Sequence, residues 1–129
     1  MKSTTIAIVI AGFLVAGSIL YSSSNRSSGE VASVDNVSIV NGKQVIDIVA
    51  GGGYSPRLTL AKAGIPTTLH LTSRTAFDCS TAVRIPSLGF GANLTPDTPA
   101  QVELPPQAKG SQLQGMCAMG MYRFAIEFE

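Results

Sequence analysis

Sulfur-bearing residues near the C-terminus form the most unusual pattern in this sequence. The stretch 114–124, QGMCAMGMYRF, holds one of the two cysteines of the chain and three of its four methionines. Cys117, Met119 and Met121 occupy every second position, and every second side chain of an extended strand projects from the same side. We therefore expect these three sulfurs to share a side. Thiolate and thioether are soft donors that select Cu(I), whereas Zn(II) prefers more Cys or His ligands.

Packing or a disulfide would explain the same sulfurs without a metal. Methionine often fills gaps in protein cores, and Met116, which is out of phase with the alternation, is expected to pack rather than to bind. Cys79 and Cys117 are 38 positions apart, and a disulfide between them would add about 3–4 kcal/mol by restricting the unfolded chain. Metal binding by thiolates, by contrast, releases protons, so a metal site predicts an affinity that falls at low pH.

The single histidine, His70, restricts the metal chemistry that the chain can support. It stands between Leu69 and Leu71 in an alternating segment, so its side chain is expected on the opposite, solvated face. A blue-copper electron-transfer site requires two histidines and a cysteine, and this chain has one histidine in all. The composition therefore excludes blue copper and leaves Cu(I) as the metal that the sulfurs favour.

The sequence lacks the arrangements that enzymes and nucleic-acid-binding proteins use. No histidine is expected beside a cysteine, and Asp78 would point away from Cys79 if that segment were extended. The glycine-rich stretch 51–56, GGGYSP, lacks the lysine and the following helix of a phosphate-binding loop. Nine Lys and Arg residues balance eight Asp and Glu residues, which indicates no basic surface for nucleic acid. We expect no catalytic role and no nucleic-acid partner.

Short alternating segments between turn signals predict the fold. We expect strands at residues 37–40, 44–50, 57–61, 67–73, 82–85, 100–105 and 122–128. The expected buried residues are Ile46, Ile48, Leu69, Leu71, Val102, Leu104, Phe124, Ile126 and Phe128. Leu58 and Leu60 should lie on one face of their strand. About six to eight short strands with frequent turns are typical of an antiparallel β-sandwich or barrel, so we predict an all-β domain.

The N-terminal segment differs in kind from the rest of the chain. Residues 5–21 carry no charge, and a helix of that length spans roughly 25 Å, just short of a hydrocarbon core of about 30 Å. We predict that residues 1–21 form a membrane anchor, with a signal peptide as the alternative. Residues 22–30 are polar and rich in serine, as in a flexible linker, and residues 31–129 should form the folded domain.

Two features point to opposite sides of the membrane for that domain. Lys2 and the α-amine precede the span and Arg26 follows it, and this small asymmetry favours an extracytoplasmic domain. Cysteines that must stay reduced to hold Cu(I) favour the cytoplasmic face, where thiols persist. Either way, we expect a protein anchored in the cell membrane by a single span.

Four stretches of the sequence resemble cupredoxin-like proteins. They are GYSPRLTLAKAGIPTTLHLTS (53–73), FDCS (77–80), IPSLG (85–89) and CAMGMYRFAIEF (117–128), which cover nearly the whole predicted domain. The cysteine of FDCS, combined with C-x-M-x-M, resembles more narrowly the membrane-anchored Cu(I) chaperones of the CupA type and the related domains of copper-exporting P-type ATPases. The resemblance implies a cupredoxin-like Greek-key β-sandwich or barrel, preceded by one N-terminal membrane helix.

The resemblance also implies a set of copper ligands. A tighter Cu(I) position would bridge Cys79 and Cys117, and a weaker, more exposed position would use Met119 and Met121 together with a shared cysteine. One residue departs from the family pattern, since related sequences often have glycine after Tyr-Arg, where this chain has Phe124.

The candidate sulfur ligands and the family resemblance together give the expected function. We expect a membrane-tethered Cu(I)-binding chaperone or buffer that serves copper resistance and passes copper to an exporting P-type ATPase by ligand exchange. One alternative is a non-metal β-sandwich interaction module with a Cys79–Cys117 disulfide. Another is an accessory cupredoxin-like domain of a metal uptake system.

Overall fold

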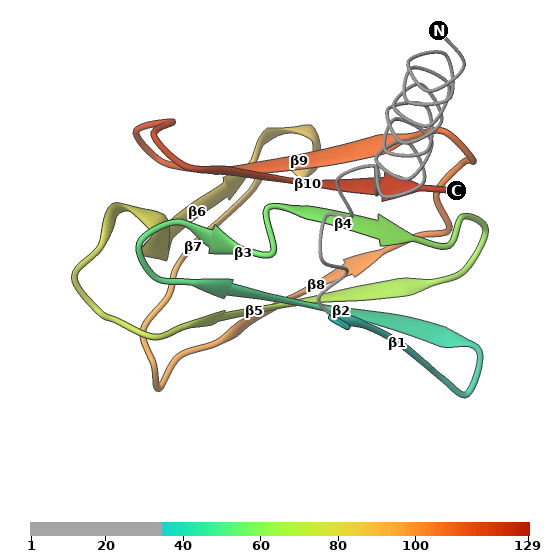
Figure 1. Cartoon of the computed structure of the whole chain (residues 1–129), viewed down its shortest axis with the longest axis horizontal. Helices are drawn as coiled ribbons and strands as arrows, with labels where there is room; N and C mark the ends of the chain where they lie inside the picture. Colours follow the sequence, from blue (N-terminus) through green and yellow to red (C-terminus); the bar gives the residue numbers. More distant parts are fainter. Residues whose placement is uncertain (1–34) are drawn as a thin grey trace, which may run out of the picture. The chain divides into compact units, whose positions relative to one another are not determined.

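The computed structural model describes residues 35–129, whose regular secondary structure is almost entirely β-strand (Figure 1). The predicted anchor, residues 1–21, and linker, residues 22–30, lie outside the described residues. The strands are β1 (Val37–Val40), β2 (Lys43–Ala50), β3 (Tyr54–Ser55), β4 (Leu58–Ala61), β5 (Thr67–Ser73), β6 (Ala82–Ile85), β7 (Phe90–Asn93), β8 (Ala100–Leu104), β9 (Gln112–Cys117) and β10 (Arg123–Phe128). Two short 3₁₀ turns accompany them, η1 (Cys79–Thr81) and η2 (Pro86–Leu88). Within this part of the chain, no helix is long and apolar enough to cross a membrane.

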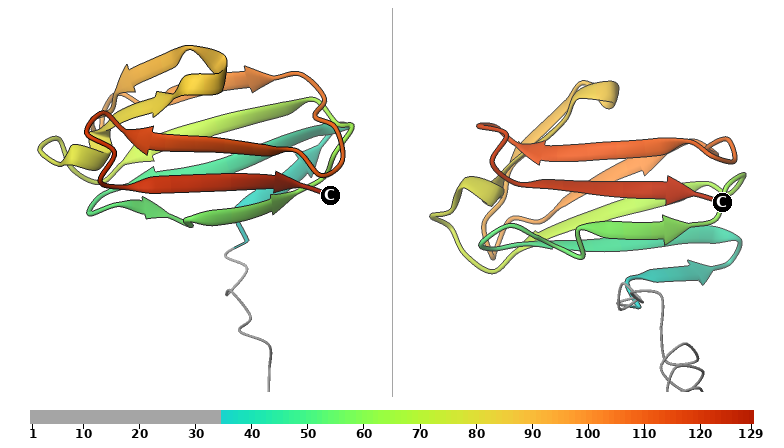
Figure 2. Two further views of the ribbon diagram at one scale, coloured as in Figure 1. Left: turned by 90° about the horizontal axis from the view of Figure 1, so that it is seen from above. Right: turned by 45° about the horizontal axis from the view of Figure 1, so that its top comes forward.

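The strands form two sheets that pack face to face (Figure 2). One sheet has the order β1-β2-β5-β8, with the short strand β3 paired to β2, and the other has the order β4-β10-β9-β6-β7. The prediction of an all-β domain is therefore confirmed for residues 35–129. The apolar side chains of both sheets meet in one core between them.

Both sheets are mixed, so the predicted purely antiparallel arrangement is wrong. Strand β2 pairs in parallel with β5, and β10 pairs in parallel with β4. Parallel neighbours need a long crossover connection, which a tight hairpin cannot provide. The chain supplies such a connection between β2 and β5, because it passes through β3 and then through β4 in the other sheet.

Three strands, β3, β7 and β9, were not predicted. The inward positions of β9 are Leu113, Gly115 and Cys117, and the glycine at the centre interrupts the apolar alternation that marks a strand. Strand β7 is a short edge strand, and its sequence FGAN also lacks the apolar alternation that predicts a strand. Pairing with the neighbouring strands β6 and β10 holds these segments extended.

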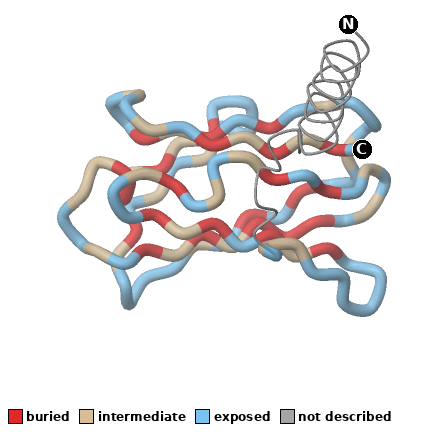
Figure 3. The backbone as a smooth tube through the Cα atoms, in the orientation of Figure 1, coloured by how far each residue is buried: buried red, intermediate tan, exposed pale blue. Residues whose placement is uncertain are grey.

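The buried residues largely match the alternation in the sequence (Figure 3). Each of these predicted core residues is at most 9% exposed: Ile46, Ile48, Leu69, Leu71, Val102, Leu104, Phe124, Ile126 and Phe128. Leu58 and Leu60 do share a face of β4, but it is the outer face, and Leu60 is 54% exposed. Thr59 faces the core instead, where its hydroxyl accepts a hydrogen bond of 2.9 Å from the Asn36 amide.

Phe124 fills a space that a glycine on the neighbouring strand leaves open. It pairs with Gly115 across β9 and β10, and a Cβ atom at Gly115 would overlap the Phe124 ring. The same ring meets Tyr54 edge to face, with centroids 4.9 Å apart and planes at 69°. The departure from the family pattern at Phe124 is therefore accommodated inside the core.

Candidate metal centre

Cys79 is the first residue of η1, and a capping aspartate holds that turn in place. The Asp78 carboxylate accepts hydrogen bonds from the Ser80 N–H and the Ser80 hydroxyl, each at 2.7 Å, and from the Gly52 N–H at 2.9 Å. These donors hold the pKa of Asp78 below its ordinary value, so its carboxylate stays charged at neutral pH. Asp78 thus joins η1 to the glycine-rich loop. The extended segment considered from the sequence at this point does not predict this role.

Cys117 is the last residue of β9, where the chain leaves the sheet in a tight turn. Its N–H donates to the Tyr122 carbonyl at 3.0 Å, and its carbonyl accepts from the Gly120 N–H at 2.8 Å. Gly120 has φ +73°, a left-handed conformation that glycine adopts without a steric penalty. We call residues 118–122 the sulfur turn, and Cys117 is fully buried at its base.

The fold brings the two cysteines into contact. Figure 2 shows η1, in the segment before β6, and the turn between β9 and β10 at the same end of the two sheets. Strand β6 follows η1 directly, and its Val83 pairs with Cys117, which aligns the two segments. The Sγ atoms of Cys79 and Cys117 are 2.9 Å apart, and both cysteines are free thiols.

The two thiols ionise unequally. Burial opposes ionisation of Cys117, but the hydrogen bond from Cys79 and the backbone N–H groups of Tyr122, Met121 and Met119 outweigh it and lower the pKa of Cys117 to about 7. The Tyr122 N–H lies 3.4 Å from the Cys117 sulfur. The pKa of Cys79 is raised, first because its proton is shared with Cys117 and then because of burial and the charge on Cys117. Cys117 therefore becomes the thiolate first.

The two methionines lie on the sulfur turn and not on a strand. The prediction that Cys117, Met119 and Met121 share one side of an extended segment is wrong, because β9 ends at Cys117 and the chain turns. Met119 is 80% exposed and Met121 is 69% exposed, so both thioethers are open to solvent next to the thiol pair. Met116 is half-buried on the outer face of β9, in phase with Gln112 and Gln114.

Harder ligands are not assembled in the described part of the chain. Residues 35–129 contain no group of three or more His, Cys, Asp and Glu side chains that could hold a metal ion. His70 lies on the outer face of its sheet, as predicted, and its Nδ1 is 2.8 Å from Asp47 Oδ1. The structure thus brings Cys79 and Cys117 together, places Met119 and Met121 beside them, and leaves the histidine elsewhere.

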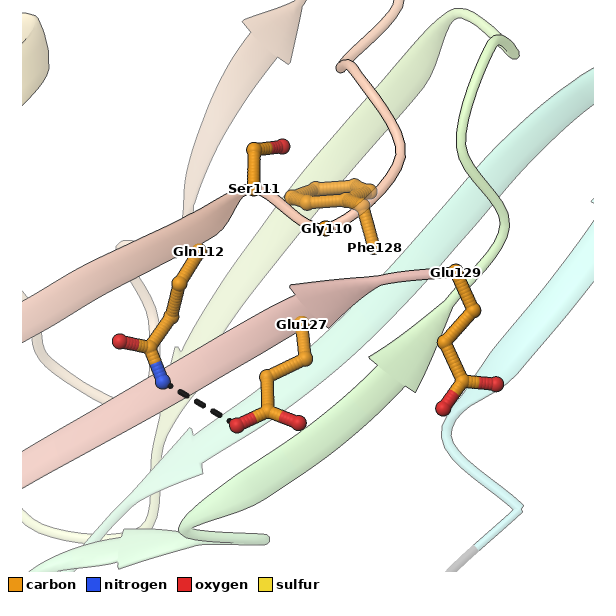
Figure 4. Close-up of a pocket in the computed structure, with 6 residues that line it drawn as sticks. All are labelled: Gly110, Ser111, Gln112, Glu127, Phe128 and Glu129. Carbon is orange, nitrogen blue, oxygen red and sulfur yellow. Dashed lines mark hydrogen bonds between the residues drawn. The ribbon is translucent and has the colours of Figure 1, made fainter.

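A shallow pocket is present at the other end of β9 and β10 (Figure 4). It is lined by Gly110, Ser111, Gln112, Glu127, Phe128 and Glu129. The Gln112 side-chain amide donates to Glu127 Oε1 at 3.2 Å across its wall. Because β9 starts at this pocket and ends at Cys117, the pocket is separate from the thiol pair.

Comparison with known proteins identifies structural neighbours. No protein-family model matches the chain, and no curated protein matches it. The chain is similar to the metal-binding domain of the Cu(I)-exporting P-type ATPase CopA from Streptococcus pneumoniae D39, crystallised with Cu(I). That match has 25% sequence identity and a TM-score of 0.63, and it covers 72% of this chain and 92% of the neighbour.

A second solved structure is similar to the same extent. It is the solution structure of a copper-binding protein in the apo form, with 26% sequence identity and a TM-score of 0.62. The match covers 72% of this chain and 94% of that protein. Because nearly the whole of each neighbour is matched, the correspondence extends over an entire domain and not over a local motif.

Sequence reasoning missed the residues that organise the thiol pair. Asp78 followed by Cys-Ser carries the signal of a helix cap, since aspartate commonly accepts from the N–H two positions on. Gly120 is a signal for a turn inside the Met-rich stretch. Tyr54, whose ring packs against Phe124, carries no such signal, because its position depends on tertiary packing.

Proposed function

We propose that this chain is a membrane-tethered Cu(I)-binding chaperone or buffer with a cupredoxin-like domain, and that it binds and transfers copper without catalysis. The observation that carries the proposal is the pair of free thiols, with Sγ atoms 2.9 Å apart, at the base of a turn that presents two exposed methionines. Two thiols and two thioethers form a soft donor set, which favours Cu(I) over harder ions. The similarity to a domain of a Cu(I)-exporting ATPase supports the same metal.

Cys79 and Cys117 are the proposed tight ligands. Thiolates bind Cu(I) more strongly than thioethers, and the pKa of Cys117, lowered to about 7, makes one thiolate available near neutral pH. The fold holds both sulfurs on well-anchored segments, one at a capped turn and one at a strand end. Copper therefore meets a preformed pair, and little chain has to be ordered on binding.

Met119 and Met121 are the proposed exchange face, sharing a cysteine in a weaker second position. Their side chains are 80% and 69% exposed, so an incoming protein can reach them without unfolding of the domain. Thioethers are weak donors, so the thiolates of a partner would displace them first and the cysteines afterwards. This order lets copper move by ligand exchange while remaining bound to sulfur throughout.

The proposed partner is a copper-exporting P-type ATPase, and the proposed location is the cell membrane. The similarity to a metal-binding domain of such an exporter supports the partner. The uncharged segment 5–21 and the serine-rich segment 22–30 support a single anchor and a flexible tether. A tether raises the effective concentration of the domain near a membrane-bound acceptor.

The metal and its ligands can be tested by X-ray absorption at the copper edge. The reduced full chain, in detergent and without oxygen, should take up Cu(I) and show a first shell of sulfur alone. A sample whose thiols were alkylated beforehand is the control and should lose the tight equivalent. A shell dominated by nitrogen or oxygen, or no uptake by the reduced chain, would contradict the proposal.

A disulfide-linked interaction module is the second candidate, and one observation favours it. The same 2.9 Å between the Cys79 and Cys117 sulfurs places them where an oxidant could join them. Mass measurement of the protein purified without reductant, before and after thiol alkylation, separates the two functions. Two alkyl groups without prior reduction support copper binding, whereas none until reduction supports the disulfide module.

A further inference from the structure

The Tyr54 hydroxyl is an unusual group in this structure. Among the buried side-chain nitrogen and oxygen atoms of residues 35–129, it alone has no hydrogen-bond partner. Tyr54 is only 5% exposed, so water does not easily supply one. Buried polar groups are nearly always hydrogen-bonded, and one without a partner destabilises the folded protein. Such a group in a folded domain calls for an explanation.

Packing places Tyr54 at the same end of the sheets as the cysteine pair. The residue follows the glycine-rich loop on β3, and its ring contacts Phe124, with centroids 4.9 Å apart. Phe124 lies across from Gly115, two positions before Cys117 on β9. The preceding residue, Gly53, lies against the ring of Tyr122 in the sulfur turn. Tyr54 is thus held between the sheets at the end where the thiols meet.

The charges around Tyr54 agree with this position. Burial is the main reason that the pKa of Tyr54 is raised, and negative charge on Cys117, on Cys79 and on Asp78 raises it further, in that order, while Arg84 opposes them. Charge interactions weaken with distance, so these effects agree with the packing that places Tyr54 at the thiol end of the sheets. Cys117 exerts the larger effect of the two cysteines.

We propose that Tyr54 is a positioning residue, whose hydroxyl donates a hydrogen bond to the Cys117 thiolate when the cysteine pair holds Cu(I). This inference rests on the proposed copper function. In the free protein, the Cys117 sulfur already accepts from Cys79 and from the Tyr122 N–H, and the Tyr54 hydroxyl is left without a partner. Copper binding removes the Cys79 proton and so opens an acceptor for the hydroxyl.

The charge balance of copper loading explains why a donor is useful there. Below about pH 7 two S–H bonds break and two protons leave to solvent, and above it one S–H bond breaks; two Cu–S bonds form in either case, without any change of oxidation state. One Cu(I) ion with two thiolates carries a net charge of one minus in a buried site. Hydrogen bonds to charged groups are the stronger ones, so a donor that rotates toward the sulfur stabilises the loaded state more than the free state.

Tyr54→Phe separates this role from a merely structural one. The change keeps the ring and its contact with Phe124 but removes the hydroxyl. The Cu(I) affinity of the full chain, measured by competition with a chelator, should fall about tenfold. The melting temperature of the metal-free protein should stay the same or rise, because a hydroxyl without a partner is removed. A structural role would instead lower the melting temperature.

Ser38→Ala is the control. Ser38 is exposed on β1, in the sheet that does not contain β9, and the change removes a hydroxyl away from the thiol pair. This variant should bind Cu(I) within about twofold of the wild type. An equal loss in both variants, or a Tyr54→Phe variant that binds as tightly as the wild type, overturns the inference. Wild-type protein that takes up no Cu(I) overturns the proposed function as well.

A spectroscopic measurement on the wild type does not depend on how the variant folds. The tyrosine doublet in the Raman spectrum reports whether a phenol donates or accepts a hydrogen bond. Loading with Cu(I) should shift the doublet of the wild type and of Ser38→Ala toward the donor state, and should leave that of Tyr54→Phe unchanged. No shift on loading of the wild type contradicts the inference.

Discussion

Cys79 and Cys117 touch, but they are chemically unequal. Cys117 lies at the base of a turn whose N–H groups face its sulfur, and these donors lower its pKa to about 7. Cys79 shares its proton with Cys117 and has a raised pKa. Near neutral pH the pair therefore holds between one and two protons, and the thiolate form of Cys117 is the one that the proposed site would use.

The unequal thiols predict how copper affinity depends on pH. Below about pH 7 both thiols are protonated, so each Cu(I) ion displaces two protons and the apparent affinity should rise about a hundredfold per pH unit. Between about pH 7 and the raised pKa of Cys79, one proton is displaced and the rise should be about tenfold per unit. Chelator competition at several pH values measures the slope. An affinity that is constant from pH 5 to 8 would rule out thiol ligands.

The methionines should affect the second copper ion more than the first. With Met119 and Met121 both changed to Ile, the tight equivalent should stay largely intact, because the thiols remain, while the second equivalent should weaken at least about tenfold. Met116→Ile, a change within β9, is the control and should alter neither equivalent. Loss of both equivalents together in the double variant would contradict the two-position arrangement.

At the scale of elements, the close packing of β9 and β10 holds the sulfur turn in position. Gly115 on β9 leaves room for the Phe124 ring, and that ring in turn packs against Tyr54. A side chain at position 115 would push the ring away and separate the strands just before the turn begins. The position of the proposed copper ligands thus depends on a packing feature two residues from the nearer cysteine.

Gly115→Ala tests that dependence. A Cβ atom at this position would overlap the Phe124 ring, and overpacking of a core commonly destabilises a protein by about 1–3 kcal/mol. Denaturant unfolding should therefore show a lower free energy of unfolding for this variant. Gln114→Ala, a change at the exposed neighbouring position, should have little effect. Equal stability of Gly115→Ala and the wild type would show that the Phe124 ring can move to accept the extra methyl group.

The sequence predicts strands where alternation is strong and fails where packing decides. Leu69, Leu71, Ile126 and Phe128 follow the alternation and are buried as expected. In the sulfur turn the same reasoning is wrong, because the chain leaves the sheet at Cys117 and Gly120 takes a left-handed conformation. The spacing of the sulfurs singled out Cys117, Met119 and Met121 as candidate ligands, but the shared side of a strand on which that choice rested is wrong.

Some features of the site depend on the tertiary fold and therefore leave no mark in the local sequence. The contact between Cys79 and Cys117 requires β6 to pair with β9, and the latter strand was not predicted. The hydrogen bond from Gly52 to Asp78 joins a loop and a turn that are 26 positions apart. Before the structure, two hypotheses made the cysteines neighbours: a Cys79–Cys117 disulfide and the copper site implied by the resemblance to cupredoxin-like proteins.

At the scale of the whole molecule, the proposed tether can be tested independently of copper. The uncharged segment 5–21 predicts that the full chain stays in the membrane fraction after a carbonate wash. A variant that lacks residues 2–21 is the control and should appear in the soluble fraction. Release of the full chain by the wash would contradict a membrane anchor and leave the copper site unaffected.

The most direct test of the account is an anaerobic Cu(I) titration of the full chain against a competing chelator, for the wild type and for Cys79→Ser. The thiol pair, with sulfurs 2.9 Å apart, predicts that the wild type binds a tight equivalent and that removal of one thiol weakens it about a hundredfold or more. Unchanged affinity and stoichiometry in Cys79→Ser would contradict the proposed copper site.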